Sequence, residues 1–219
     1  REAPSLVAGK PLTESFEIQE YGVRYHISFQ SGYSQGIFLD QRENRMRVRE
    51  RCQSGDTVLN TFAYTGAFSV CAALAGATTT TLDLSQPYLD WARENMALNR
   101  IDEEGQHFCR GDAFHWLRRF ARQNRRFTGI VLDPPTFSRD HQGNIFRVEE
   151  HYGDLVTLAA SCLSPGGWLL CTSNCRRLSG PVFTRMISNA LPSGAHIETH
   201  PMPPDFTGDP YLKTVMVET

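Results

Sequence analysis

The chain has 219 residues, of which 40 % are hydrophobic and 21 % charged, and its formal net charge is −2. This length supports one full hydrophobic core, and no apolar run is long enough to cross a membrane. The near-neutral charge argues against a protein that simply coats nucleic acid.

The chain begins with Arg1 and not with Met, so we expect it to be a trimmed chain or a piece of a longer protein. Its N-terminus lacks a basic region followed by an apolar one, and no secretory signal is expected. The first dozen residues read as loosely structured. Residues 16–19 and 24–29 then alternate apolar and polar side chains around Tyr21-Gly22, which predicts a β-hairpin. An arginine-rich helix is expected over 41–52.

From residue 57 the sequence alternates short apolar or β-branched runs with helical segments. We expect strands at 57–63, 78–84, 108–111, 128–132 and 168–172. We expect helices at 67–75, 86–99, 113–124, 148–162 and about 180–190, with a turn at Ser164-Pro165-Gly166-Gly167. Two further strands, 195–202 and 211–218, are joined only by a loop, so one of them is expected to be antiparallel. This pattern predicts an α/β fold with a mostly parallel sheet covered by helices on both faces. We divide it into an N-terminal extension with the hairpin, 1–35, and a main domain, 36–219.

Six cysteines are scattered at 52, 71, 109, 162, 171 and 175, without a Cys-x-x-Cys pair. No histidine lies at a zinc-like spacing from them, so a metal site is not expected. Unpaired cysteines in a domain of this size indicate a reducing cytoplasm.

Polar loops and carboxylates follow the first four strands of this predicted sheet. The first strand runs into Asn60–Gly66, and the next three end at Asp83, Asp112 and Asp133. Ligands of open parallel sheets bind at this edge. The Asn60–Gly66 loop lacks the glycines of a pyrophosphate-binding loop, which favours a cofactor with an adenosine and no phosphate over NAD. Each aspartate taken alone has a simpler explanation as the N-cap of the next helix.

At these positions the chain resembles class I S-adenosylmethionine-dependent methyltransferases, and among them bacterial enzymes that modify large-subunit ribosomal RNA. One branch of these enzymes methylates cytosine at carbon 5, and another methylates guanine at nitrogen 7. The resemblance covers residues 14–219 and rests on motifs in the same order: Phe38-Leu39-Asp40-Gln41-Arg42, Asn60-Thr61-Phe62-Ala63-Tyr64-Thr65-Gly66, Asp83-Leu84-Ser85, Asp133-Pro134-Pro135-Thr136-Phe137-Ser138 and Ser173-Asn174. It implies a Rossmann-like fold with a seven-stranded sheet.

The resemblance also implies the roles of individual residues. Asp83 would hold the cofactor ribose, and Asp112 and Ala113 would meet adenine. The other residues implied to bind the cofactor are Phe38, Asp40, Arg42, Asn60, Phe62, Ala63, Tyr64, Thr65, Gly66, Leu84, Ser85 and Asp133. Those implied to line the target pocket and act in catalysis are Asp133, Pro134, Pro135, Phe137 and Asn174.

The Asp133–Phe137 loop suits methyl transfer to a planar, nitrogen-rich acceptor. Two prolines remove backbone donors, so that carbonyl oxygens and the carboxylate face the substrate as acceptors. Phe137 is placed to stack on a base, with a core aromatic as the plainer alternative. Residues 138–147 read as a mobile lid.

Methylation at carbon 5 of a pyrimidine needs a cysteine thiolate. Cys175 is displaced from the position used by the carbon-5 branch, and the tail Pro204–Thr207 resembles the guanine branch. A surface-near bystander thiol is therefore favoured, together with a guanine nitrogen as the target.

Of the 22 basic residues only Lys10 and Lys213 are lysines, and five arginines crowd into each of 42–51 and 118–126. This pattern is equally compatible with two interpretations. The segments contact RNA, or they are two solvated helix faces. Three other readings stay open for the whole chain. They are a methyltransferase for a small molecule or protein side chain, a non-catalytic RNA-binding module, and an NAD-dependent oxidoreductase.

Overall fold

A computed structural model describes residues 8–10, 15–29, 34–139, 143 and 145–219. Most of the first dozen residues, which were expected to be loosely structured, lie outside this described part. The same holds for 140–142 and 144 in the predicted lid. None of the helices within the described residues is long and apolar enough to cross a membrane.

Seven strands form one sheet in the spatial order β10-β11-β9-β6-β3-β4-β5. Their bounds are β3 (Thr57–Thr61), β4 (Thr78–Asp83), β5 (His107–Arg110), β6 (Phe127–Leu132), β9 (Leu163–Ser173), β10 (His196–His200) and β11 (Lys213–Glu218). The β3–β4, β3–β6, β4–β5 and β6–β9 pairs are parallel. Strand β11 is antiparallel to both of its neighbours, β9 and β10, so it alone of the seven strands has the opposite direction. The predicted fold class is confirmed.

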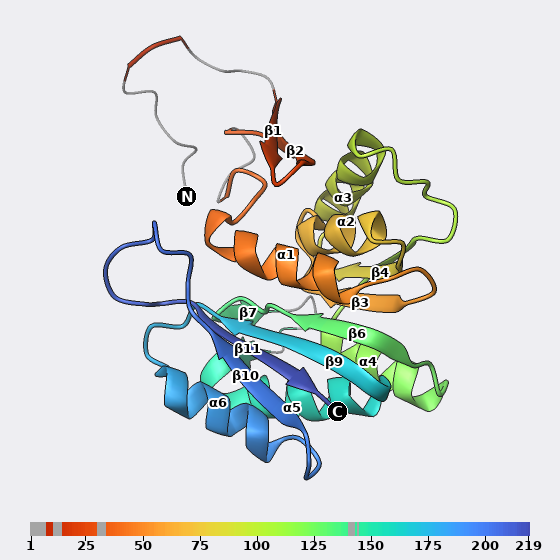
Figure 1. The fold of residues 1–219 in the computed structure, drawn as a ribbon, viewed down its shortest axis with the longest axis vertical. Coiled ribbons are helices and arrows are strands. Elements are labelled where there is room, and N and C mark those ends of the chain that lie inside the picture. The colour runs from red at the N-terminus through yellow and green to blue at the C-terminus, as the bar shows by residue number, and fades with distance from the viewer. Residues whose placement is uncertain (1–7, 11–14, 30–33, 140–142, 144) are drawn as a thin grey trace.

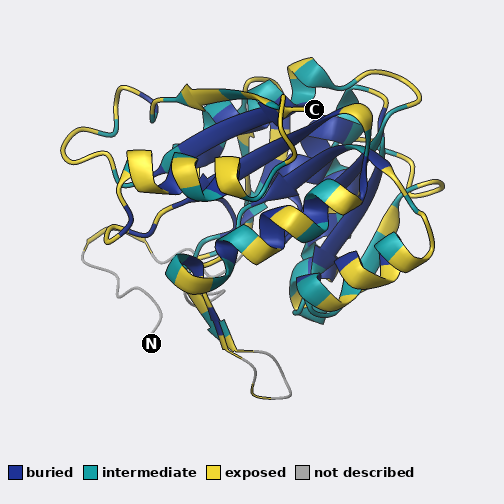
Figure 2. Ribbon diagram, turned by 90° about the horizontal axis from the view of Figure 1, so that it is seen from below, coloured by how far each residue is buried: buried dark blue, intermediate teal, exposed yellow. Residues whose placement is uncertain are grey.

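Helices cover both faces of this sheet (Figure 1). One side carries α1 (Arg42–Arg51), α2 (Ala67–Leu74) and α3 (Gln86–Leu98). The other carries α4 (Ala113–Arg122), α5 (Val148–Ser161) and α6 (Gly180–Asn189). The strands lie buried between the two layers, and the outer helix faces are exposed (Figure 2).

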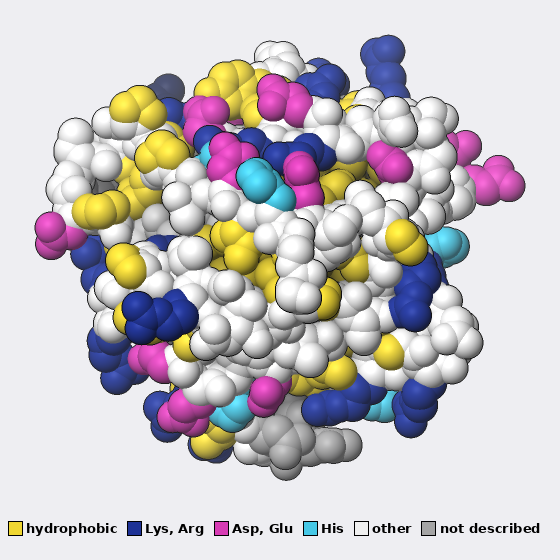
Figure 3. Space-filling model, turned by 60° about the horizontal axis from the view of Figure 1, so that its bottom comes forward, with side chains coloured by type: hydrophobic (Ala, Val, Ile, Leu, Met, Phe, Trp, Pro, Cys, Tyr) yellow, Lys and Arg dark blue, Asp and Glu magenta, His cyan; other side chains and the backbone are white. Residues whose placement is uncertain are grey.

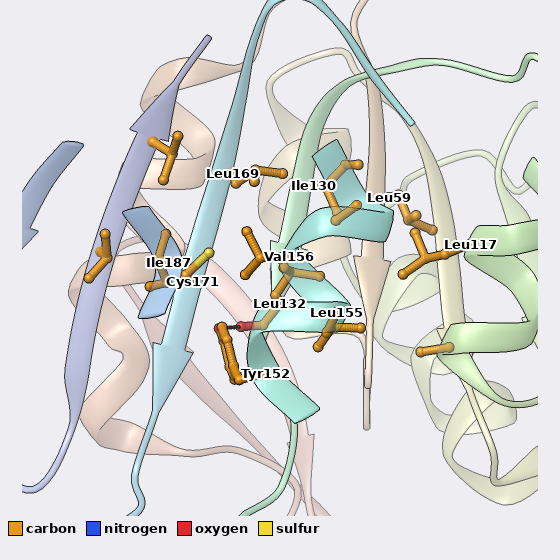
Figure 4. Close-up of a cluster of buried hydrophobic side chains, with 14 of the residues drawn as sticks. Leu59, Leu117, Ile130, Leu132, Tyr152, Leu155, Val156, Leu169, Cys171 and Ile187 are labelled. Carbon is orange, nitrogen blue, oxygen red and sulfur yellow. Dashed lines mark hydrogen bonds between the residues drawn. The ribbon is translucent and has the colours of Figure 1, made fainter. Parts of the chain in front are cut away.

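The period of two along each strand assigns its side chains to the two layers. Leu169 and Cys171 of β9 pack with α4, α5 and α6, whereas Leu170 packs with α1 and α2. Figure 4 shows the first of these clusters, with the Tyr152 hydroxyl donating to the Leu132 carbonyl at 2.9 Å. That hydrogen bond anchors α5 under the last residue of β6, immediately before Asp133.

The predicted hairpin is confirmed as β1 (Phe16–Glu20) paired with β2 (Val23–Ile27). Its apolar side packs on α2 and α3. Two asparagines of the α3 end fix it further, because Asn95 and Asn99 side chains accept from the His26 and Arg24 amides, each at 2.9 Å. The division of the chain at residue 35 stays a prediction.

Two local features differ from the sequence expectation. Strand β9 begins at Leu163, so Ser164–Gly167 lies inside a strand and not in a turn before it. A register shift between Phe127 and Gly129 absorbs the extra residues, and the Trp168 ring lies against Gly129, where a side chain would clash. The expected lid contains two short antiparallel strands, β7 (Phe137–Arg139) and β8 (Ile145–Arg147).

Candidate active site

A cavity of about 590 Å³ lies at the carboxyl edge of the parallel strands. The segment before α1, the loop after β3, the end of β4 and the loop after β6 all contribute to its wall. The predicted site residues that line it are Phe38, Asp40, Phe62, Ala63, Tyr64, Thr65, Asp83, Leu84, Asp133, Pro134, Pro135, Phe137 and Asn174. The predicted site residues outside this lining are Arg42, Asn60, Gly66, Ser85, Asp112 and Ala113.

The loop after β3 holds an unusual backbone. Phe62, Tyr64 and Gly66 all adopt left-handed conformations, with φ of 54°, 52° and 72°. A non-glycine residue in this region costs of order 1–3 kcal/mol, and such strain concentrates at ligand sites. Gly66 is required on a second ground, because a Cβ there would lie 2.6 Å from Cβ of Ala92. The loop therefore has a fixed shape at the cavity, and this shape costs local stability.

Asp83 is held by the backbone on both carboxylate oxygens. The amide of Tyr64 donates to Oδ2 at 2.8 Å, and the amide of Ser85 donates to Oδ1 at 2.9 Å. Burial raises the pKa of Asp83 above its usual value, and these amides oppose that rise. Each oxygen keeps a further lone pair, so the carboxylate suits the paired hydroxyls of a ribose.

The segment before α1 is bonded to this loop. Thr65 donates its hydroxyl to the Gly36 carbonyl at 2.6 Å, and Tyr64 donates to the Ser34 carbonyl at 2.9 Å. The Tyr64 ring lies 5.5 Å from the Phe38 ring and 4.6 Å from the Tyr88 ring, measured between centroids. Phe38, 41 % exposed, is thereby held at the cavity entrance.

Asp133 is oriented by a residue that the sequence argument did not single out. Gln41 donates from Nε2 to Oδ1 of Asp133 at 3.0 Å, and Thr172 donates to the same oxygen at 2.5 Å. Asn44 in turn donates to Oε1 of Gln41 at 2.6 Å and to Thr214 at 2.9 Å. The only sequence signal for Gln41 was its place inside the Phe38–Arg42 motif.

The carboxyl of Asp133 lies in an environment that disfavours its charge. Burial raises its pKa to about 6, and the nearby Asp40 carboxylate adds to the rise. The hydrogen bonds from Thr172 and Gln41 act in the opposite direction. The buried Arg45 guanidinium lowers this pKa as well, and the two carboxylates in the cavity wall suit a ligand that carries positive charge.

The loop from Asp133 to Phe137 is fixed at both ends. Thr136 donates to Oδ1 of Asn174 at 2.9 Å, and its carbonyl accepts from the Val148 amide at 3.2 Å. Phe137 is 49 % exposed at the cavity wall. It is therefore available for stacking and is not a core aromatic.

Several predicted cofactor residues have structural partners instead of a place in the cavity wall. Asp112 is the N-cap of α4 and accepts from the His115 amide at 2.9 Å. Asn60 is fully buried and donates to Ser69 at 3.0 Å. Ala113 is the first residue of α4 and is buried. Their roles toward a cofactor stay predictions.

The cysteines lie apart from this site. All six are within the described residues, and none lines the cavity. Cys175 follows the cavity-lining Asn174, but its side chain is 2 % exposed and belongs to the buried cluster on the α4, α5 and α6 side of the sheet. Burial raises the pKa of Cys171 to about 12. A thiolate nucleophile is not offered to a ligand in this cavity.

The cavity fits the predicted cofactor in two respects. Asp83, the aromatic side chains and the strained loop suit an adenosine, whereas Asp40 and the buried Asp133 suit the cationic methionine end. Among the described residues, no three His, Cys, Asp or Glu side chains gather into a metal-binding group.

Comparisons with known proteins agree with this geometry. Residues 2–215 match a protein family described as S-adenosylmethionine-dependent methyltransferase. A ribosomal RNA large subunit methyltransferase I from Aeromonas salmonicida is 36 % identical over 87 % of this chain and 48 % of its own. A ribosomal RNA large subunit methyltransferase K/L from Alcanivorax borkumensis is 43 % identical over 69 % of this chain and 21 % of its own. The chain thus spans about half or less of these relatives.

Among solved structures, a methyltransferase crystallised in complex with SAH superposes with a TM-score of 0.91 at 28 % identity. The match covers 97 % of this chain and 58 % of that one. A SAM-dependent methyltransferase from Agrobacterium tumefaciens superposes with a TM-score of 0.82 at 23 % identity, over 95 % of this chain and 71 % of its own. The second likeness concerns the fold alone.

Proposed function

The chain belongs to the S-adenosylmethionine-dependent methyltransferase family, and from that premise we propose that it methylates a nitrogen of a base in ribosomal RNA, with guanine favoured over carbon 5 of cytosine. The cofactor supplies an electrophilic methyl carbon. The observation that carries the proposal is the acceptor-lined loop from Asp133 to the half-exposed Phe137 in a cavity that no cysteine lines.

The residues of the chain then have three tasks. Asp83 and the loop around Tyr64 hold the adenosine, and Asp40 with Asp133 faces the cationic end. Phe137 stacks on the flipped base, and the carbonyl oxygens of the Asp133-Pro134-Pro135 turn accept hydrogen bonds from its amino or imino group. This fixes the nucleophilic nitrogen in line with the methyl carbon, and alignment supplies much of the rate.

The choice of nitrogen over carbon rests on the cysteines. Attack on a pyrimidine ring needs a thiolate within reach of the base. Cys175 is buried outside the cavity lining, so the carbon-5 route has no candidate among the six cysteines. Cys175→Ala is therefore expected to leave RNA methylation nearly unchanged. Loss of activity in a variant that still binds S-adenosylhomocysteine would restore the cytosine route.

RNA as the substrate is supported by the names of the relatives and by exposed aromatic side chains at the cavity. Of the two arginine-rich segments, the one in α1 is engaged within the protein through Arg42, Arg45 and Arg51, which pair with acidic residues. The arginines of the second segment that lie in α4, Arg118, Arg119 and Arg122, are exposed. A cytoplasmic location accords with six free cysteines.

Transfer of tritium from labelled S-adenosylmethionine to undermethylated ribosomal RNA tests the proposal. Nuclease digestion and chromatography should place the label in a methylated guanosine. Label in 5-methylcytidine would overturn the nitrogen target. If no label enters RNA while calorimetry shows cofactor binding, the acceptor is a small molecule or a protein. Binding of NAD in place of S-adenosylmethionine would overturn the methyl-transfer proposal.

A further inference from the structure

Two exposed arginines, Arg147 and Arg176, belong to segments that border the cavity. On the face drawn in Figure 3, basic, acidic and histidine side chains are interspersed, and no broad surface of one sign appears. The arginines of α1 do not supply such a surface either. Arg45, for example, is 2 % exposed and pairs with Glu20 at 2.7 Å. Single exposed arginines beside the cavity are therefore the candidates for contact with a phosphate chain.

Arg147 is the first of these groups. It lies opposite Phe137 in the β7–β8 pair, and its Cζ is 5.4 Å from the centroid of that ring. Phe137 lines the cavity, so the guanidinium lies at the mouth. The side chain is 45 % exposed, and its nearest carboxylate, in Glu150, is 3.8 Å away. A solvated contact of that length is readily exchanged for a stronger partner.

Arg176 is the second group, and it comes from a different part of the chain. Its Cζ is 4.9 Å from the centroid of the Tyr211 ring, and the next residue in the chain, Leu212, lines the cavity. Asn174, two residues earlier, also lines the cavity. Arg176 is exposed and therefore stands at the same mouth as Arg147.

Stacking on a ring prepares each guanidinium for phosphate. The ring covers one face of the planar group and restricts its motion, while the N–H donors remain in the plane and point outward. Two such donors match two oxygens of a phosphate. Two further apolar side chains near these positions are exposed, namely Phe38 in the cavity wall and Ile145 in the same strand as Arg147. Aromatic surface interleaved with basic groups is typical of sites for unpaired nucleic acid.

We propose that Arg147 and Arg176 bind two phosphates that flank the nucleotide whose base enters the cavity, so that the partner of this surface is an unpaired stretch of RNA. The inference rests on the proposed function. It places the phosphate contacts at the mouth and not on the arginine-rich helix α4.

The chain contains a matched control for both positions. Arg118 and Arg119 are exposed on α4 and also lie over aromatic rings, those of Phe114 at 5.7 Å and Trp116 at 4.9 Å. Phe114 and Trp116 are outside the cavity lining, whereas Phe137 beside Arg147 belongs to it, and so does Leu212, which follows Tyr211. The double variants R147A/R176A and R118A/R119A thus remove the same charge and the same kind of stack from two places.

Binding of a fluorescein-labelled, unstructured RNA oligonucleotide is measured against salt concentration, in parallel with methylation of ribosomal RNA and calorimetry with S-adenosylhomocysteine. Each phosphate contact on a single strand contributes about 0.7 to the slope of log K against log salt, so R147A/R176A should lose about 1.4. In R147A/R176A the KM for RNA should rise, whereas the affinity for S-adenosylhomocysteine should remain that of the wild type. R147K/R176K should recover the wild-type salt slope. R118A/R119A should retain the wild-type slope.

A loss of slope in R118A/R119A but not in R147A/R176A would overturn the inference while leaving the proposed function intact, and so would an equal loss in both. If the wild-type protein does not methylate RNA at all, the proposed function itself fails, and this inference fails with it. Retained binding of S-adenosylhomocysteine in each variant shows that the comparison is made on folded protein.

Discussion

Arg42, the first residue of α1, and Asp205, in the segment between β10 and β11, form a two-pronged ion pair across 163 positions of sequence. The pair ties the start of α1, two residues after the cavity-lining Asp40, to the segment that leads to the cavity-lining Leu212. Neither partner lines the cavity. Arg42 was predicted to bind the cofactor, and that role stays a prediction, while the ion pair holds the start of α1 beside the residues that do line the site.

Asp205→Asn should therefore weaken binding of S-adenosylhomocysteine by a few-fold and stability only slightly, since the Asp205 side chain is 59 % exposed. Arg42 lowers the pKa of Asp205, so the contribution of the pair is present above the ordinary carboxyl pKa of 3.8 and is lost as the pH falls through the lowered value. Calorimetry of wild type, R42A, D205N and the double variant measures the coupling. Additive losses would show that the two side chains act independently.

The carboxyl of Asp133 should make cofactor binding depend on pH. Its pKa of about 6 lies above the usual 3.8. In the free protein this favours the protonated form, so stability rises as the pH falls from about 6 toward 3.8. A cationic ligand needs the ionised form, so affinity for S-adenosylmethionine should fall as the pH drops below about 6. Isothermal titration with S-adenosylmethionine over this pH range checks the sign. Asp133→Asn should bind the cofactor weakly, and its affinity should not depend on pH in this range. A flat profile for the wild type would exclude Asp133 as the group that faces the cation.

Gln41 should act as a positioning residue for Asp133. Gln41→Leu removes the donor to Oδ1 and leaves one of the two N–H donors of the buried Asn44 without an acceptor, which should cost about 1–3 kcal/mol of stability. Since the hydrogen bond from Gln41 lowers the pKa of Asp133, its loss should move the acid limb of kcat/KM to higher pH. Gln53→Leu, on an exposed turn, serves as the control. A Gln41 variant that loses stability but keeps the wild-type pH profile would reduce Gln41 to a packing role.

Gly66 should tolerate no side chain. Gly66→Ala forces a Cβ to 2.6 Å from Ala92 in a left-handed backbone, and we expect a loss of roughly 2–3 kcal/mol with weaker cofactor binding. Gly55→Ala isolates the backbone term, because Gly55 is also left-handed but has no atom within 4 Å of the added Cβ. That variant should lose about 1 kcal/mol. Urea unfolding of both measures the difference. Equal losses would mean that the contact with Ala92 relaxes freely.

The sequence predicted most elements of the main sheet and its helices, because their patterns are local. A run such as Phe127–Leu132 is apolar throughout since both its faces are covered, and the turn residues around it mark its ends. The β7–β8 pair was not predicted, because its three-residue strands are too short to show the alternation of a strand. The Ser164–Gly167 stretch contains turn residues and was predicted as a turn. In the structure it belongs to β9, because Leu163 before it pairs with Phe127 of β6.

The order of strands and loops was thus sufficient to place Asp83 and Asp133 at one edge of a sheet, since parallel strands linked by helices must end together. Only the tertiary structure decided what each side chain does there. Gln41 meets Asp133 across 92 positions of sequence, and Asp112 caps its own helix although its pattern matches that of Asp83. Such outcomes depend on distances between segments that are remote in sequence, and no local pattern encodes those distances.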